Sequence, residues 1–268
     1  MALSLPFTDR TDNTDQFAEI SATTATLEMR VLALDKLQHE ILLMQGIRPA
    51  QNSIADFILG PLRNAFPNSS FPTAAIHEFI TENKESTSST SGFIAGVLTS
   101  LMKNAGTTMW IGTSPKLFPP ALKTFGIEPD RFLFIDIKKE KDVMWAMDEA
   151  LKCDALSAVV AEMQDLSFTE SRRLQLAVEK SRVTGFVLRT NPRKIGTTAC
   201  VSRWKITSTH SEPIDGMPGI GFPQWKVDLL RIRNGKPGSW ELRWENGRFY
   251  NVEKAVARDI DDQQLLAV

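Results

Sequence analysis

The middle of the chain alternates short, continuous apolar runs with segments whose apolar positions recur every three or four residues. The apolar runs predict buried strands at residues 75–80, 107–111, 132–137, 156–161 and 185–189. The three- and four-residue spacing predicts a helix from residues 90–93 to 104, a helical turn at 120–125, and helices at 140–153 and 169–181. This order predicts an α/β fold with a mostly parallel central sheet and helices on both of its faces.

The last third of the chain changes to strict alternation of apolar and polar residues. Three such stretches occur, at residues 199–207, 224–233 and 240–244, with Gly/Pro-rich turns at 215–223 and 234–239 between them. Alternation of this kind is typical of strands that have one face in the core and one face in solvent. We therefore expect a C-terminal antiparallel extension of the parallel sheet.

The two ends of the chain differ from this core domain, which we assign to residues 71–250. Residues 1–24 are rich in Thr, Asp, Ser and Asn, which predicts a flexible arm. Residues 47–70 predict a proline-containing connector with a short helix at 54–59. Residues 251–268 predict a charged tail. Residues 25–46 predict an amphipathic helix. Its apolar face consists of Leu27, Leu34, Leu37, Ile41 and Met44. That face packs either on its own domain or on a partner or second copy, and homo-oligomerisation through it is one expectation.

Composition narrows the function classes. The 268 residues carry a net charge of -1 and are 42% hydrophobic, which predicts a soluble protein with no bulk attraction to nucleic acid or to anionic membranes. No apolar run approaches the ~18 residues of a membrane span, and we see no signal peptide, so we expect a cytoplasmic protein without membrane contact. Cys153 and Cys200 lie in apolar surroundings and predict core positions. We find no metal-binding motif and expect no metal.

A polar stretch at residues 81–91 follows the first predicted strand, where many α/β proteins bind phosphate. A phosphate-binding loop needs glycines, a lysine and a following Ser or Thr for Mg²⁺. This stretch has no such motif, and Lys84 lies between Glu82 and Glu85, which would repel a triphosphate. The positions that remain of such a loop are Lys84, Ser88, Thr90 and Ser91. We therefore expect no bound cofactor and no catalytic residue.

The stretch from residue 188 to residue 211 carries five cations and no Asp or Glu. The cations are Arg189, Arg193, Lys194, Arg203 and Lys205. They form either a solvated basic face or a surface that contacts phosphates, as in weak DNA binding, or an acidic partner. The nearby indoles of Trp204 and Trp225 either fill the core or stack on bases.

Four segments carry a family resemblance. They are FPTAAIHEF (71–79), SRRLQLAVE (171–179), ACVSRWKIT (199–207) and GMPGIGFPQWKVDLLRIRNGKPGSWELRWENGRF (216–249). Together they resemble the ImuA family, bacterial proteins related to RecA and to the cell-division inhibitor SulA. The resemblance covers about two-thirds of the chain and implies a RecA-like core domain.

The resemblance also implies which site has been lost. The residues that match the Walker A loop of RecA are the stretch at 81–91. The strand that in RecA ends in a catalytic acidic residue ends here in Gly112, Thr113 and Ser114, and the strand matching Walker B, at 158–161, is followed by a single carboxylate, Glu162. A core without ATPase activity is therefore expected.

By resemblance, the protein is expected to be a non-catalytic accessory factor in damage-induced (SOS) mutagenesis and translesion DNA synthesis. The implied partners are an ImuB-type polymerase homologue and an error-prone C-family polymerase, with RecA as a third candidate. Two alternatives stay open: a divergent RecA-like ATPase with a degenerate phosphate loop, and a SulA-like inhibitor of cell division.

Overall fold

The computed structural model describes residues 58–102, 106–113, 117–211 and 221–252, together with residues 30, 33, 34, 36 and 37. The chain divides into two compact units, residues 1–48 and 49–268. In the first unit the five described residues are helical, and the side chains of Leu34 and Leu37 are exposed. Leu27, Ile41 and Met44 of the predicted apolar face lie outside the described residues, as do the predicted arm and almost all of the predicted tail.

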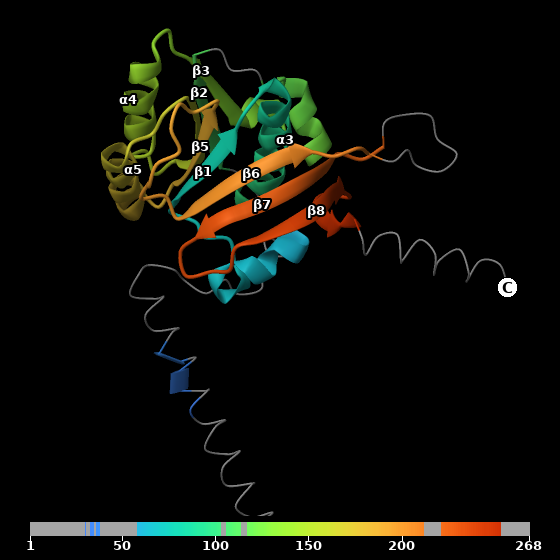
Figure 1. Ribbon diagram of the computed structural model, residues 1–268. Helices are drawn as coiled ribbons and strands as arrows, with labels where there is room; N and C mark the ends of the chain where they lie inside the picture. The colour runs from blue at the N-terminus through green and yellow to red at the C-terminus, as the bar shows by residue number, and fades with distance from the viewer. Residues whose placement is uncertain are drawn as a thin grey trace, which may run out of the picture. The chain divides into compact units, whose positions relative to one another are not determined.

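The described strands of the second unit form one nine-stranded sheet (Figure 1). They are β1 (Ile76–Thr81), β2 (Thr107–Gly112), β3 (Phe132–Asp136), β4 (Leu156–Met163), β5 (Thr184–Thr190), β6 (Ser202–Ser208), β7 (Gln224–Ile232), β8 (Gly238–Glu245) and β9 (Arg248–Asn251). The order across the sheet is β3-β2-β4-β5-β1-β6-β7-β8-β9. Neighbours from β3 to β6 are parallel and those from β6 to β9 are antiparallel, which confirms the predicted mostly parallel sheet with an antiparallel extension.

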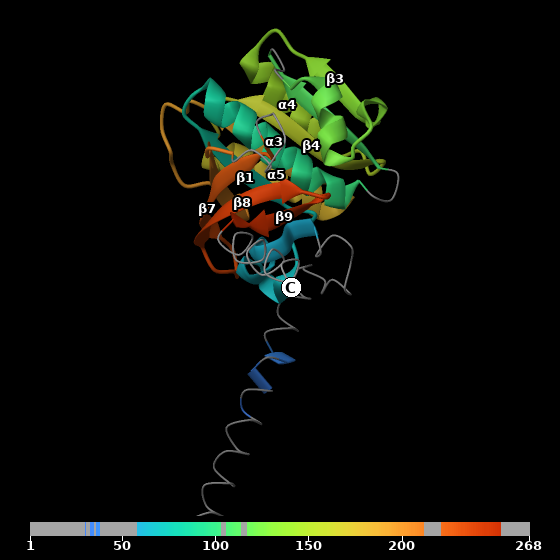
Figure 2. The same ribbon diagram turned by 90° about the vertical axis from the view of Figure 1, so that its right-hand side faces the viewer.

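Helices cover both faces of the parallel part of the sheet (Figures 1 and 2). The helix α3 (Lys84–Leu101) packs with Phe79 on one face, and α4 (Glu140–Ala150) and α5 (Phe168–Ser181) pack with Ile76 on the other. Short 3₁₀ helices complete the described part: η1 (Gly60–Ala65), η2 (Pro67–Ser69), η3 (Pro119–Phe125) and η4 (Pro129–Arg131). Alternate side chains of β1 therefore enter two separate cores.

The core on the α3 side is aromatic. The Trp204 side chain is fully buried and lies parallel to the Phe79 ring, with 6.0 Å between ring centroids and 9° between ring planes. Trp225 is 4% exposed and lies against Gly92 of α3. Of the two alternatives for these indoles, core packing is confirmed and base stacking is wrong.

The residues before β1 also belong to this core. Leu59, Leu62 and Phe66 are buried in the cluster that contains Trp204 and Phe249. The carbonyl oxygen of Phe249 lies so close to Gly60, where φ is +53°, that a Cβ atom on Gly60 would overlap it. The second half of the predicted connector thus closes the end of the sheet near β9.

The two cysteines differ in environment. Cys200 is buried as predicted, and burial raises the pKa of its thiol to about 12. Cys153 is exposed, so its predicted core position is wrong. It follows α4, where Leu151 takes the buried position in the last turn instead. Neither cysteine forms a disulfide.

His77 is a buried polar residue on the α3 side of β1. Its Nε2 donates to the Pro72 carbonyl oxygen at 2.7 Å, so its Nδ1 accepts from Ser202 Oγ at 2.7 Å, and Ser202 Oγ accepts from the Trp204 indole. Burial lowers the pKa of His77 to about 4. The folded protein therefore holds this imidazole neutral across the physiological range.

This burial predicts a pH-dependent stability. Because the pKa of His77 is lower in the folded than in the unfolded state, stability is complete above the unfolded pKa near 6.5 and is lost as the pH falls toward 4. We expect His77 to lower the free energy of unfolding by about 2 kcal/mol between pH 7 and pH 5. Urea unfolding of the wild type and His77→Gln at both pH values tests this. A wild-type loss equal to that of the variant would contradict it.

Candidate functional site

The polar stretch at residues 81–91 follows the carboxyl end of β1, and the structure corrects where the next helix begins. Most of the stretch at residues 81–91 is not a loop, because α3 begins at Lys84 rather than near Thr90. Asn83 caps the helix: its side chain accepts from the Ser86 amide at 2.8 Å, while Ser86 Oγ accepts from the amides of Asn83 and Glu82. A cluster of Ser and Thr residues favours loops in general, but here the hydroxyls of Thr87, Ser88, Ser89 and Ser91 donate to carbonyl oxygens one turn earlier.

The four residues expected to remain from a phosphate loop therefore lie on one helix. Ser88 Oγ donates to the Lys84 carbonyl oxygen and Ser91 Oγ donates to that of Thr87. Thr90 and Ser91 are buried against the sheet, whereas Lys84 and Ser88 are exposed on the helix surface. The structure does not bring these four side chains together around a common point.

Two glutamates at this helix start are bound to β6. Glu82 forms an ion pair with Lys205 at 2.7 Å, and Glu85 accepts from Ser208 Oγ. The amides of Glu82, Asn83 and Ser86 are already bonded to side chains within the same turn. The positive end of the helix dipole thus faces carboxylates of its own chain, which stabilise it in the way that a bound anion would.

The cap gives a prediction for the helix start. Replacing Asn83 with Ala should lower the free energy of unfolding by about 1 kcal/mol, because the Ser86 amide loses its acceptor. Ser88→Ala is the matched control, since Ser88 is exposed one turn into the helix and Ala has the higher helix propensity. Urea denaturation measures both. Equal effects of the two changes would indicate that the helix begins after Ser88.

At the end of β4, Glu162 lies on the α3 side of the sheet. Its Oε1 accepts from the indole nitrogen of Trp110 on β2 at 2.6 Å. Gly112, at the end of β2, packs against this carboxylate: a Cβ there would lie 3.5 Å from Glu162 Oε2. The single carboxylate that follows the strand matching Walker B thus accepts a hydrogen bond from a buried tryptophan.

A buried ion-pair network lies on the opposite face of β1. Glu78 is fully buried, and its two carboxylate oxygens accept from Arg189 Nη1 at 2.6 Å and from Arg203 Nε at 2.8 Å. Thr198 Oγ1 donates to the same carboxylate at 2.8 Å. A buried carboxylate is strongly unfavourable unless it is paired in this way.

The five predicted basic residues are only partly available to a partner. Arg189 is 1% exposed, Arg203 is 15% exposed, and both pair with Glu78, which leaves these two side chains little surface to offer a partner. Lys205 pairs with Glu82, and Arg193 Nε donates to Asp165 Oδ2 at 2.6 Å, which lowers the pKa of that carboxyl. Lys194 is exposed and forms no side-chain bond within the described residues.

Sequence reasoning missed the carboxylates because they come from elsewhere in the chain. No Asp or Glu occurs at residues 188–211, but Glu78 reaches the cations from within β1, Glu82 from just after that strand, and Asp165 from the turn after β4. A glutamate inside a buried strand was the available signal, since such a group requires a partner. Arg231 and Arg233, whose side chains also reach this region, were missed for the same reason.

A hollow of about 600 Å³ lies between α4 and α5. Its lining residues are Asp148, Lys152, Asp154, Arg173, Leu176, Ala177, Lys180 and Ser181. Asp148 accepts from Arg173 at 2.6 Å and pairs with Lys152 at 2.9 Å. Burial raises the pKa of this carboxyl, but the two cations outweigh burial and lower it overall. This arrangement joins the two helices.

The described residues contain no group of three or more His, Cys, Asp or Glu side chains that could hold a metal ion. No helix in the described part of the chain is long and apolar enough to cross a membrane.

The fold and the site define a class of protein: a mixed α/β protein with a mostly parallel sheet, an antiparallel C-terminal extension, and a first β–α junction closed by its own side chains. No protein-family model matches the chain. Among curated proteins, the Protein ImuA of Caulobacter vibrioides, from strain NA1000 / CB15N and from strain ATCC 19089 / CIP 103742 / CB 15, is 30% identical over 190 residues. The match covers 66% of this chain and 78% of each relative. The chain belongs to the ImuA family, which confirms the resemblance found in its sequence.

Proposed function

We propose that this protein is a non-catalytic accessory factor of damage-induced mutagenesis and translesion DNA synthesis. It acts through contacts with an ImuB-type polymerase homologue and an error-prone C-family polymerase. Membership of the ImuA family supports a role in damage-induced mutagenesis. The absence of catalysis and the identity of the partners are our proposal.

The observation that carries the non-catalytic part is the closed start of α3. In a phosphate-binding loop, free backbone amides and a lysine surround the ligand. Here the side chains of Asn83 and Ser86 occupy three of the amides, and Glu82 and Glu85 add negative charge at the helix start. Binding ATP would require breaking the cap and separating Glu82 from Lys205.

A variant of Glu162 provides a second test of the proposal that the protein is non-catalytic. The change Glu162→Gln keeps an oxygen that can accept from the Trp110 indole but removes the carboxylate that a Mg²⁺ ion would need. We expect cells carrying this variant to show the wild-type frequency of mutations after DNA damage. A frequency as low as that of a strain lacking the protein would contradict the proposal.

Partner identity is tested by purification of the tagged, full-length chain from cells treated with a DNA-damaging agent. The proposal expects the ImuB-type homologue and the C-family polymerase to co-purify, and expects the amounts to be unchanged by Glu162→Gln. Co-purification of the division protein FtsZ in place of a polymerase would favour the SulA-like alternative instead.

A further inference from the structure

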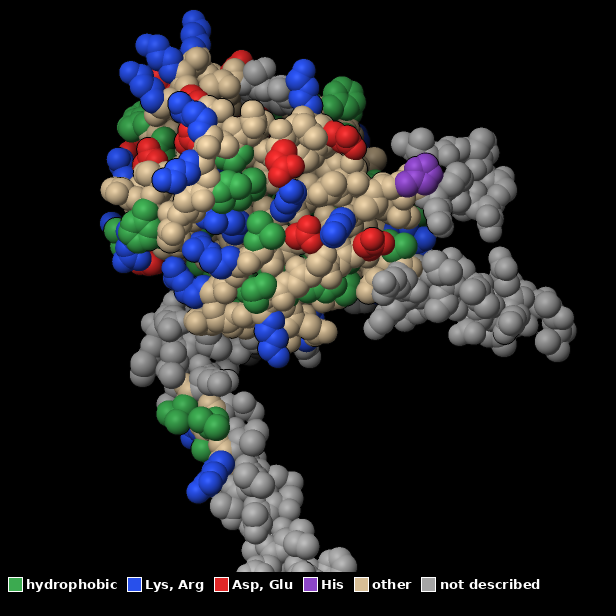
Figure 3. All heavy atoms as spheres, viewed as in Figure 1, with side chains coloured by type: hydrophobic (Ala, Val, Ile, Leu, Met, Phe, Trp, Pro, Cys, Tyr) green, Lys and Arg blue, Asp and Glu red, His purple; other side chains and the backbone are tan. Residues whose placement is uncertain are grey.

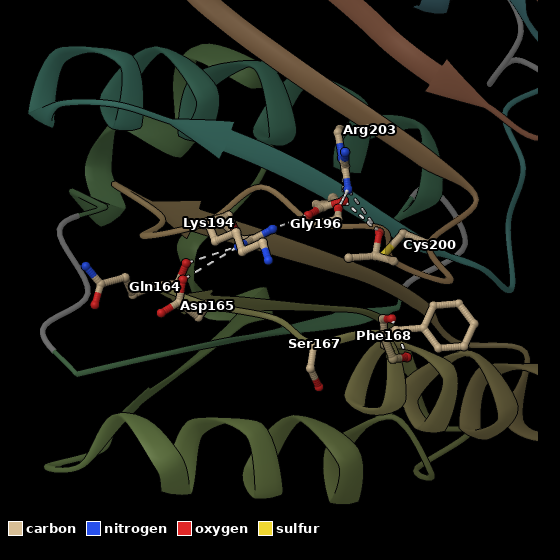
Figure 4. A network of polar contacts seen from close by, with 12 residues as sticks. Gln164, Asp165, Ser167, Phe168, Lys194, Gly196, Cys200 and Arg203 are labelled. Atoms are coloured by element: carbon tan, nitrogen blue, oxygen red, sulfur yellow. Dashed lines mark hydrogen bonds and ion pairs between the residues drawn. The ribbon is translucent and has the colours of Figure 1, made fainter.

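The segment between β5 and β6, residues 191–201, has no regular secondary structure, yet arginine side chains hold its carbonyl oxygens. Arg189 Nη2 donates to the Lys194 carbonyl oxygen at 2.8 Å, and Arg203 Nη2 donates to that of Gly196 at 2.5 Å. Arg231 Nη2 bonds the carbonyl oxygens of Thr198 and Cys200. Figure 4 shows Arg203 pointing from its strand toward the segment at Gly196.

The turn after β4 and the start of α5 hold the same segment from the other side. Asp165 accepts from the Arg193 amide at 3.1 Å, and Gln164 Nε2 donates to the Asn191 carbonyl oxygen at 3.1 Å. Ser171 Oγ accepts from the Ala199 amide at 2.9 Å. In Figure 4, Gln164 and Asp165 lie on this side of the network. A segment fixed along both sides loses little conformational entropy when a partner binds it.

Positive charge is in excess among the charged side chains that belong to residues 191–201 or contact them. The six cations are Arg189, Arg193, Lys194, Arg203, Arg231 and Arg233, and the carboxylates are Glu78 and Asp165, which leaves an excess of four positive charges. Among the described residues, Arg231 and Arg233 donate to carbonyl oxygens and form no ion pair. Figure 3 shows many Lys and Arg side chains with fewer Asp and Glu among them on the side of α4, α5 and this segment, whereas the two signs occur in more equal numbers over β6, β7 and β8.

An aliphatic side chain lies among these charges. Ile195 is 56% exposed, and its neighbour Lys194 is exposed as well. An exposed aliphatic group contributes to binding when a partner covers it with apolar surface, which a phosphate backbone cannot supply. The indoles that could have stacked on bases, Trp204 and Trp225, are buried in the core on the α3 side. These observations favour a protein partner over a nucleic acid.

We propose that residues 191–200 form a preformed docking surface for an acidic segment of a partner protein, in which Asp or Glu side chains flank an aliphatic or aromatic one. Ile195 contacts the apolar side chain, and Lys194, Arg231 and Arg233 attract the carboxylates. This inference deepens the proposed function, since it rests on the protein acting through protein contacts.

The test uses the full-length protein and an array of synthetic 12-residue peptides that place Leu, Ile or Phe between Asp and Glu residues. Matched peptides replace the apolar residue with Ser or the acids with Asn and Gln. We expect the tightest acidic–apolar peptide, labelled with fluorescein, to bind with about fivefold lower affinity to Lys194→Glu and to Ile195→Ser. Both matched peptides should bind more weakly than the parent.

The chain offers matched controls on β7. Lys226→Glu changes an exposed cation that is paired in register with Glu241 on the neighbouring strand β8, and Leu230→Ser changes an aliphatic residue that is 50% exposed. Neither should alter peptide affinity, and thermal unfolding of all four variants checks that they fold. The proposal fails if no acidic–apolar peptide binds, if Ile195→Ser binds as tightly as wild type, or if the β7 variants lose as much affinity as the loop variants. It also fails if an oligothymidylate displaces the peptide and binds Ile195→Ser normally.

Failure of this surface and failure of the proposed function are distinguishable in cells. If only the surface is wrong, Lys194→Glu and Ile195→Ser support damage-induced mutagenesis as well as wild type does. If the proposed function is wrong, a strain that lacks the protein shows no loss of damage-induced mutagenesis, whatever the peptides do.

Discussion

Replacing Glu78 with Leu should lower the free energy of unfolding by about 3–5 kcal/mol, because two buried guanidinium groups lose their carboxylate. Arg189 is 1% exposed and Arg203 is 15% exposed, and Glu78 is the carboxylate within 3 Å of each. Urea denaturation at neutral pH measures the change. The segment at residues 191–200 should also lose protection from proteolysis, since Arg189 and Arg203 position its carbonyl oxygens.

Two further variants make this result specific. Adding Arg189→Met to Glu78→Leu should recover part of the lost stability, because a buried guanidinium whose nearest remaining carboxylate is Asp165 at 3.7 Å is then replaced by an apolar side chain. Glu82→Gln removes an exposed carboxylate that pairs with Lys205 and should cost less than about 1 kcal/mol. A double variant no more stable than Glu78→Leu would show that the unpaired arginine is not the cause.

Replacing Trp204 with Ala should cost about 3–5 kcal/mol, because the indole is fully buried and its removal leaves a large cavity. The indole packs between the rings of Phe79, Phe93 and Phe66, and its nitrogen donates to Ser202 Oγ at 2.6 Å. Chemical denaturation followed by circular dichroism measures the loss.

Trp145→Ala is the control for this change. Trp145 is 63% exposed on α4, so its removal should alter stability by no more than about 0.5 kcal/mol. A small effect at Trp204, or an equally large one at Trp145, would contradict the assignment of Trp204 to the core.

Periodicity predicted β1 to β8 in order, since the parallel strands are continuous buried runs and the antiparallel ones alternate, but it missed β9, which has only four residues. It failed at the start of α3. The Ser and Thr residues between Asn83 and Gly92 have low helix propensity, but the Asn83–Ser86 cap and burial of Thr87, Thr90 and Ser91 outweigh that preference.

The candidate site was less predictable because its charges meet only in the folded sheet. The register places Glu78 between Val187 on β5 and Arg203 on β6. All three carboxylate partners of the basic stretch, Glu78, Glu82 and Asp165, lie far from it in sequence. Local composition therefore indicated a free basic surface where the structure has a paired network. The outward-facing part of that stretch, Lys194 and Ile195, became recognisable only once the arginines beneath it were placed.

Calorimetric titration of the full-length protein with Mg²⁺-ATP tests the proposed loss of the nucleotide site most directly. We expect no saturable binding at millimolar nucleotide, because the start of α3 is closed by Asn83, Ser86 and two glutamates. Sub-millimolar binding that is abolished by Glu162→Gln but retained in Ser88→Ala would contradict the account, since it would show a working nucleotide site that uses the carboxylate at the end of β4.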